Sequence, residues 1–353
     1  MTKRHVELDQ DVQEPIDEEI DEIDRRLTTA DDPAPVVAEI LADLFGDRAA
    51  YERYRAGESV SSLERVRLQS YDPRNVLTET EQWAEQEPAV IRESKCLRYL
   101  WEGFDLTPLA NNVAFALPFR QVLADHRFAE AGDGLRLFGG IKIQGGHNIE
   151  MGDNVVVHND VLLDDRGRLE IGDRVSIADR CHLHTHRHDT VDQTNVTSYR
   201  TILEADVRLG YGAMIDAGCS IGTNAMVGAS SIVRGDVPAH HIAVGSPATT
   251  VKIKAGWEPL GDHPEPLVDN REDRRLDRPL PEDFDEFDEF GRDLSPPGDP
   301  EHAYPLTGGR PTGEDPSGTA KFLPEQRSSF RKVDLPAPGG YPLSRCTPQA
   351  GTR

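Results

Sequence analysis

The chain has 353 residues and a formal net charge of −24 at pH 7, because 63 acidic side chains outnumber 39 lysines and arginines. This balance argues against a nucleic-acid or anionic-membrane surface, since either needs a basic stripe. No apolar run reaches the roughly 20 residues of a membrane helix, and the N-terminus carries no apolar signal segment, so we expect a cytoplasmic protein.

Lysine is rare, with seven lysines against 32 arginines. An acidic excess with little lysine is typical of a protein from a salt-rich cytosol, where screening relieves self-repulsion. An ordinary acidic protein with acidic tails is the alternative. The four cysteines are scattered and form no Cys-x-x-Cys pair, so we expect neither a zinc cluster nor a disulfide framework.

Residues 1–134 are predicted to form a helical region. Apolar residues recur at helical spacing in 36–45, 89–101 and 117–129, and breakers such as proline and glycine separate these stretches. The first 35 residues are acidic and interrupted by proline, a composition that is typical of disorder.

From residue 135 to 257 the helical spacing gives way to a repeat of six residues. A period of six fits neither an α-helix nor an isolated hairpin, but it is typical of a parallel β-helix in which each unit supplies one short strand and one corner. The aliphatic residues of the repeat are Leu137, Ile143, Met151, Val157, Leu163, Ile171, Ile177, Leu183, Leu209, Ile215, Ile221, Val227 and Val233.

Three steps in this series are longer than six. Two measure eight residues, and the third, from Leu183 to Leu209, measures 26. The interruptions lie three units apart, and three units make one turn of a triangular helix, so we expect all three at the same corner. The longest predicts a loop over 184–208, and a built-up corner is typical of an active-site rim.

Residues 258–353 form the third compositional region. Residues 262–353 hold 15 of the 25 prolines together with charged stretches, and such a composition cannot bury enough apolar surface to offset the entropy of ordering. We therefore expect a largely disordered, acidic, proline-rich tail.

The repeat resembles the hexapeptide-repeat acyltransferases, and among them the maltose, galactoside and nodulation-type sugar O-acetyltransferases. Ile171-Gly172-Asp173 matches the start of their catalytic segment, and Gly245-Ser246-Pro247-Ala248 matches their closing Gly-x-Pro-Ala. The resemblance implies a mainly β fold with a left-handed triangular β-helix over 135–257.

Alternating histidines stand at the start of the 26-residue step and just before it. Those at 182, 184, 186 and 188 would share one strand face, but neighbouring side chains on one strand rarely converge on one ion, so we expect no metal. Transfer of an acetyl group from a thioester to an alcohol needs a base, and imidazole, with an ordinary pKa of about 6.5, suits that task. Counting without gaps places the family's catalytic base at His188, and His186 is the second candidate.

The resemblance also implies binding residues. Asn159, Asp164 and Asp165 stand where the family positions its acceptor, although turn geometry alone also favours such residues at a corner. The residues implied for binding coenzyme A are Met214, Ala217, Ala229, Arg234, Thr249, Lys252 and Lys254.

The activity implied is transfer of an acetyl group from acetyl-CoA to a hydroxyl of a small acceptor, with a sugar as the family's usual substrate. The family also implies a homotrimer with active sites between subunits. Two alternatives are a metalloenzyme similar to the γ-class carbonic anhydrases on the same fold, and a non-catalytic trimeric scaffold whose terminal regions bind partners.

Overall fold

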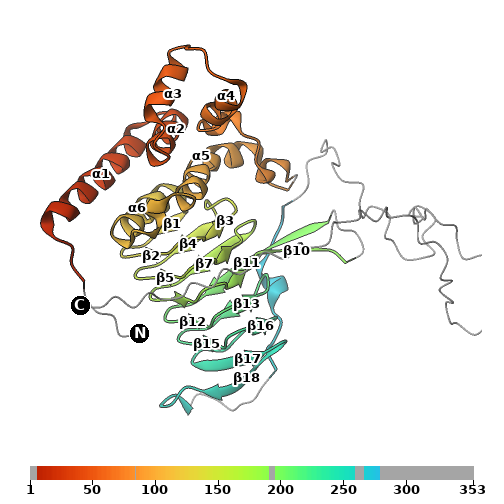
Figure 1. Ribbon diagram of the computed structural model, residues 1–353. Coiled ribbons are helices and arrows are strands. Elements are labelled where there is room, and N and C mark those ends of the chain that lie inside the picture. The colour runs from red at the N-terminus through yellow and green to blue at the C-terminus, as the bar shows by residue number, and fades with distance from the viewer. Residues whose placement is uncertain (1–5, 84, 191–194, 259–265, 279–353) are drawn as a thin grey trace, which may run out of the picture. The chain divides into compact units, whose positions relative to one another are not determined.

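A computed structural model gives the fold of the protein (Figure 1). The described residues are 6–83, 85–190, 195–258 and 266–278. The predicted disorder of most of the C-terminal tail concerns residues outside these ranges. The described chain forms a helical region followed by a β-solenoid of about six turns, which confirms the two main architectural predictions. No described helix is both long and apolar enough to cross a bilayer.

In the described part of the helical region the chain forms six α-helices and three 3-10 turns. Their bounds are α1 (Gln10–Thr29), α2 (Pro33–Leu44), α3 (Arg48–Arg55), α4 (Ser62–Gln69), η1 (Pro73–Asn75), η2 (Glu79–Gln82), α5 (Pro88–Asp105), η3 (Pro108–Asn111) and α6 (Val113–Arg127). The expectation of disorder in the first 35 residues is wrong for α1. Its acidic residues alternate with an apolar stripe of Ile20, Ile23 and Leu27, which is buried and gives the helix a face to pack.

The solenoid consists of three sheets whose strands pair in parallel from coil to coil. The first sheet contains β1 (Glu130–Ala131), β4 (Ile149–Met151), β7 (Arg168–Ile171), β11 (Val196–Leu203) and β14 (Ser220–Ile221). The second contains β2 (Arg136–Leu137), β5 (Val156–Val157), β8 (Ser176–Ile177), β12 (Arg208–Leu209), β15 (Met226–Val227), β17 (His241–Gly245) and the antiparallel β18 (Ala248–Ile253). The third contains β3 (Lys142–Ile143), β6 (Leu162–Leu163), β9 (His182–Leu183), β13 (Met214–Ile215) and β16 (Ile232–Val233).

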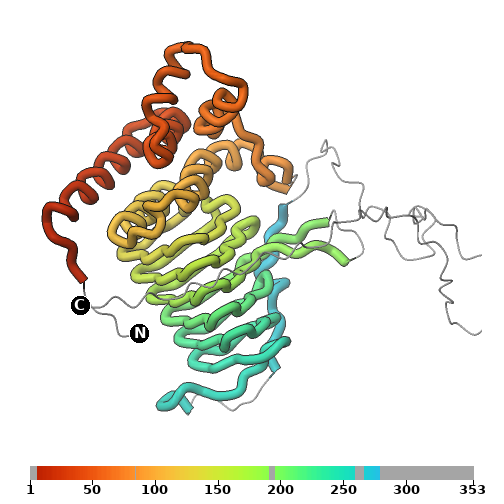
Figure 2. Tube along the Cα trace, viewed as in Figure 1, coloured from red at the N-terminus to blue at the C-terminus, as the bar shows by residue number. Residues whose placement is uncertain are grey.

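The six-residue repeat sets the register of these sheets. In the third sheet, for example, Ile143 pairs with Leu163, which pairs with Leu183 in the next coil. All the aliphatic residues of the predicted series are buried, so each sheet contributes one column of stacked side chains to the core. The stacked coils follow one another in Figure 2.

The structure differs from the sequence prediction within 184–208. This stretch is not a single loop: it contains strand β10 (His186–His188) and strand β11, whose last residue, Leu203, fills the core column of the first sheet. The fourth coil therefore begins six residues before Leu209. Leu203 keeps the six-residue spacing to Leu209, so the sequence prediction began this coil one unit too late.

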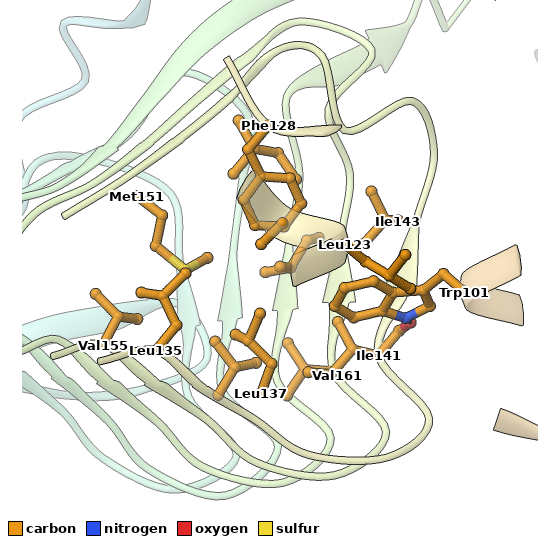
Figure 3. Close-up of a cluster of buried hydrophobic side chains, with 14 of the residues drawn as sticks. Trp101, Leu123, Phe128, Leu135, Leu137, Ile141, Ile143, Met151, Val155 and Val161 are labelled. Atoms are coloured by element: carbon orange, nitrogen blue, oxygen red, sulfur yellow. The ribbon is translucent and has the colours of Figure 1, made fainter. Parts of the chain in front are cut away.

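Helices α5 and α6 cover the open end of the first coil (Figure 1), and their side chains Trp101 and Leu123 lie beside Ile141 of that coil (Figure 3). The indole Nε1 of Trp101 donates a hydrogen bond to the carbonyl oxygen of Ile141 at 3.0 Å. Arg120, on α6, donates to the carbonyl of Leu137 at 3.1 Å. The helical region and the solenoid consequently share one hydrophobic core.

Residues 266–278, which we call the strap, are ordered within the stretch expected to be a disordered tail. They include η5 (Arg271–Arg274) and β19 (Arg275–Leu276), which pairs with β11 in the antiparallel direction. In Figure 2 the strap is the blue segment that runs back along the coils. The composition of this region gave no sign of the strap, because its arginines anchor it through polar contacts and, among its described residues, only Leu267 packs against the hydrophobic core.

Candidate active site

The three interruptions of the repeat do fall at one corner, as predicted. Each follows a strand of the third sheet (β3, β6 or β9) and precedes a strand of the first sheet (β4, β7 or β11). We call the turns that connect the third sheet to the first the insertion corner. In successive coils it comprises the described residues 144–148, 164–167, 184–190 with 195, 216–219 and 234–236.

A hairpin formed by β10 and β11 projects from the insertion corner in the third coil. His186 pairs with Ser198, and His188 pairs with Val196. The side chain of His186 is half-buried, whereas His188 is exposed. The two imidazole rings stand edge to face, with centroids 5.3 Å apart. The structure thus brings both candidate bases to the same strand but gives them different surroundings.

His186 is held by a buried carboxylate. Its Nδ1 lies 2.6 Å from Oδ2 of Asp164, which occupies the same corner one coil earlier and is only 1% exposed. Burial alone would raise the pKa of the Asp164 carboxyl, but the hydrogen bond and charge of His186, together with the amide of Thr185, hold that pKa below its ordinary value. A carboxylate that accepts from Nδ1 fixes the ring so that Nε2 is the basic nitrogen.

The turn around Asp164 is pinned by further hydrogen bonds. Asp164 accepts from the backbone amides of Thr185, at 2.9 Å, and Arg166, at 3.1 Å. The Thr185 hydroxyl donates to the Asp164 carbonyl at 2.9 Å and accepts from the Gly167 amide at 2.8 Å. Because the three hydrogen bonds that involve Thr185 are buried in the corner, the carboxylate has little freedom to leave His186.

The other two histidines of the alternating series lie before the hairpin. His182 is on β9, and its ring centroid lies 6.1 Å from that of His184. Burial lowers the pKa of His184, which favours its neutral form. Among the described residues, no group of three or more His, Cys, Asp or Glu side chains is arranged to hold a metal ion.

The residues predicted to bind the acceptor are not gathered at one place. Asn159 lies at the corner between the second and third sheets, where its Nδ2 donates to Asp179 at 2.9 Å. Asp164 and Asp165 lie at the insertion corner but are each about 1% exposed. Asp165 accepts from the amides of Gly145 and Gly146. In this chain both aspartates hold the corner together instead of facing solvent.

The residues predicted to bind coenzyme A are spread over all three corners. Thr249 and Lys252 are exposed on β18, while Lys254 donates to Asn224 at 2.7 Å beside the corner between the first and second sheets. Met214 faces outward on the third sheet.

Ala229 lies between the second and third sheets, and Ala217 and Arg234 lie at the insertion corner. Ala217 is fully buried, and the Arg234 carbonyl accepts from Arg271 of the strap at 2.8 Å. One chain alone therefore does not collect these seven residues into one site.

Sequence reasoning missed two features of the site. It assigned Asp164 to the acceptor, whereas the structure pairs it with His186. It also gave no role to Arg271 and Arg274, whose partners are described below. The sequence could have suggested only that Asp164 lies close to the histidines, because Asp164 and the histidine series both follow third-sheet positions of the repeat, in successive coils.

The Asp164–His186 contact predicts a pH-dependent loss of stability in Asp164→Asn. Because the folded pKa of Asp164 lies below its ordinary 3.8, its stabilising contribution is present above pH 3.8 and is lost as the pH falls through the folded value. We expect the variant to lose about 1.5–3 kcal/mol of unfolding free energy at pH 7, and less at pH 3, measured by urea denaturation. Asp160→Asn, at an exposed corner position, serves as the control and should change stability by less than about 0.5 kcal/mol.

The chain is similar to solved structures, but it matches no sequence family. No family model and no curated protein matches the chain. It is similar to a maltose O-acetyltransferase from Clostridium difficile 630, with 24% identity, a TM-score of 0.43, and coverage of 50% of this chain and 97% of that one. It is also similar to the hexapeptide-repeat-containing acetyltransferase VCA0836 from Vibrio cholerae, with 23% identity, a TM-score of 0.41, and coverage of 50% and 94%.

A galactoside acetyltransferase in complex with coenzyme A matches with 21% identity and a TM-score of 0.41, over 62% of this chain and 96% of that one. The solved structures that this chain resembles thus include hexapeptide-repeat acetyltransferases with a β-solenoid fold. At these identities the resemblance describes the chain path and assigns no reaction to the protein.

Proposed function

We propose that this protein is an acetyl-CoA-dependent O-acetyltransferase that acts on a hydroxyl of a small acceptor, with a sugar as the first substrate class to test. The observation that carries the proposal is the imidazole of His186, oriented by the buried carboxylate of Asp164 at 2.6 Å. The choice of acetyl-CoA as the acyl donor and the left-handed path of the solenoid rest on the sequence resemblance.

The chemistry is a direct transfer. With Nδ1 held by Asp164, Nε2 of His186 takes the proton of the acceptor hydroxyl as its oxygen attacks the thioester carbonyl. When the tetrahedral intermediate collapses, the carbon–sulfur bond breaks and the thiolate leaves with the proton from the imidazolium. The products are the acetyl ester and free coenzyme A. His188 stands beside His186 and is the alternative base.

Two cysteines of the solenoid are poor candidates for an acyl-enzyme. Cys181 and Cys219 are buried in the solenoid wall. Burial raises the pKa of Cys181 to about 11 and that of Cys219 to about 12, so neither forms an appreciable thiolate near neutral pH. This supports a single-step transfer over a double displacement.

We further propose a homotrimer with active sites between subunits. The outward positions of the third sheet include Leu162, Met214 and Ile232, whereas those of the first sheet include Glu150 and Glu170. Lys142 and His182 are the other two outward residues of the third sheet, and the apolar part of this face, next to the insertion corner, favours burial against another copy of the chain. Light scattering at high salt should give the mass of three chains.

A thiol-release assay tests the reaction. Purified protein is mixed with acetyl-CoA and a panel of sugars, nucleotide sugars and amino acids in high salt, and free coenzyme A is measured with a thiol reagent. We expect release that depends on at least one hydroxyl acceptor and stops when the acceptor is omitted. No acceptor-dependent release across the panel, or activity that requires added zinc, would count against the proposal.

A further inference from the structure

The strap crosses the insertion corner at its last two coils. Arg271 is 5% exposed; it donates to Asp216 at 3.1 Å and to the Arg234 carbonyl at 2.8 Å. Arg274 donates to the Gly218 carbonyl at 2.7 Å and to Asp236 at 2.5 Å. These two guanidinium groups fasten the strap to two successive turns of the corner.

The corner is shaped to receive the strap. A Cβ atom on Gly218, which has a φ of +78°, would lie 2.7 Å from Cβ of Arg271. A Cβ atom on Gly235 would lie 2.8 Å from the carbonyl oxygen of Val268. That same segment accepts a hydrogen bond from the Asp236 amide at 2.7 Å. Glycine at these turns allows the strap to lie directly against the solenoid backbone.

The strap also contacts the hairpin that carries the candidate base. Strand β19 pairs with one edge of β11 at Ser198 and Tyr199, while β10 pairs with the other edge and places His186 opposite Ser198. Without β19, the outer half of β11 would keep only one hydrogen-bonded neighbour. An isolated two-stranded hairpin is at best marginally stable in water.

The end of the strap reaches the turn that carries Asp164. Arg278 donates to Oε1 of Gln86 at 3.3 Å, and Gln86 donates to the carbonyl of Arg166 at 3.3 Å. The amide of Arg166 in turn donates to Asp164. The strap is thereby connected to both partners of the Asp164–His186 pair.

We propose that the strap is a positioning element for this pair, and that Arg271 and Arg274 are positioning residues that act through the hairpin. This inference rests on the proposed function for its kinetic consequence, but its structural part stands alone. It gives a role to a segment within the stretch that was expected to be a largely disordered tail.

The test uses the full chain with Arg271→Ala and Arg274→Ala combined, and Arg275→Ala as the matched control. Arg275 lies in the same strap, but its side chain is exposed and forms an ion pair with Glu272 at 3.7 Å. Hydrogen exchange should become about tenfold faster in β10 and in residues 196–199 of the double variant, while β8 and β15 stay unchanged. Because His186 would be held less firmly, kcat should fall about 10- to 100-fold. KM for acetyl-CoA should stay within about twofold.

A second variant covers the case in which the double variant fails to fold. Gly235→Ala should push the strap off the corner without removing any charge, and should produce the same exchange and kinetic pattern. Unchanged exchange in β10 would overturn the proposal, as would faster exchange with unchanged kcat. If the wild-type protein transfers no acyl group, the proposed function fails, and the exchange data alone decide whether the strap holds the hairpin.

Discussion

Replacing His186 with alanine should lower kcat for acetyl transfer by about 10²- to 10⁴-fold, the contribution typical of a general base. The expected size follows from the geometry, because Nδ1 of His186 lies 2.6 Å from the buried carboxylate of Asp164. KM for acetyl-CoA should change little, since the imidazole acts on the proton of the acceptor and not on the thioester carrier. Steady-state kinetics with the best acceptor from the assay measure both constants.

His188→Ala is the matched control for this variant. It lies two residues along the same strand and is exposed, so its removal should leave kcat within about fivefold of the wild-type value, as for a residue outside the proton transfer. The reverse pattern, with turnover lost in His188→Ala and retained in His186→Ala, would make His188 the base. That result would mean that the base is identified by its position in the family's motif, and not by its contact with Asp164. Circular dichroism spectra of both variants, compared with that of the wild type, check that neither substitution disturbs the fold.

The solenoid could be predicted from sequence because a single six-residue repeat of aliphatic residues sets its register. Each inward position, such as Leu163 or Leu183, repeats the same environment in every coil, so the pattern survives substitutions at single sites. The shared corner of the three interruptions followed from the same counting. Nothing beyond the aliphatic spacing was needed for either conclusion.

The pairing of Asp164 with His186 could not be predicted in the same way. Whether two corner residues in successive coils meet depends on the path of the inserted chain, and the insertion here turned out to be a hairpin with β11 as its second strand. The strap was missed for a different reason. Its anchors, Arg271 and Arg274, bind carbonyls and carboxylates, and such contacts leave no hydrophobic pattern in the sequence.

At the N-terminus, too, the amino-acid composition predicted disorder where the chain is folded. The acidic stretch that became α1 was expected to be disordered, yet Ile20, Ile23 and Leu27 are spaced to form one buried stripe. Average charge describes a whole segment, whereas three well-placed apolar residues are enough to dock a helix onto a neighbouring core.

The largest expected effect on stability comes from Trp101→Ala. Trp101 is 2% exposed, its indole donates to the Ile141 carbonyl at 3.0 Å, and its ring packs 6.4 Å from that of Phe128. Truncation of a buried tryptophan leaves a cavity and typically costs about 3–5 kcal/mol, and here it also leaves a backbone acceptor of the first coil without its donor. Urea denaturation followed by circular dichroism gives the change in the free energy of unfolding.

Trp257→Ala is the control, because Trp257 is 43% exposed and stacks on His240 at the other end of the solenoid; its loss should cost less than about 1.5 kcal/mol. A solenoid is stabilised by neighbour contacts, so weakening its helical cap should act most strongly on the adjoining coil. Hydrogen exchange in Trp101→Ala should therefore rise more in β2 and β3 than in β15. Equal costs for the two tryptophans, or a uniform rise along the coils, would mean that α5 and α6 do not act as the cap of the solenoid.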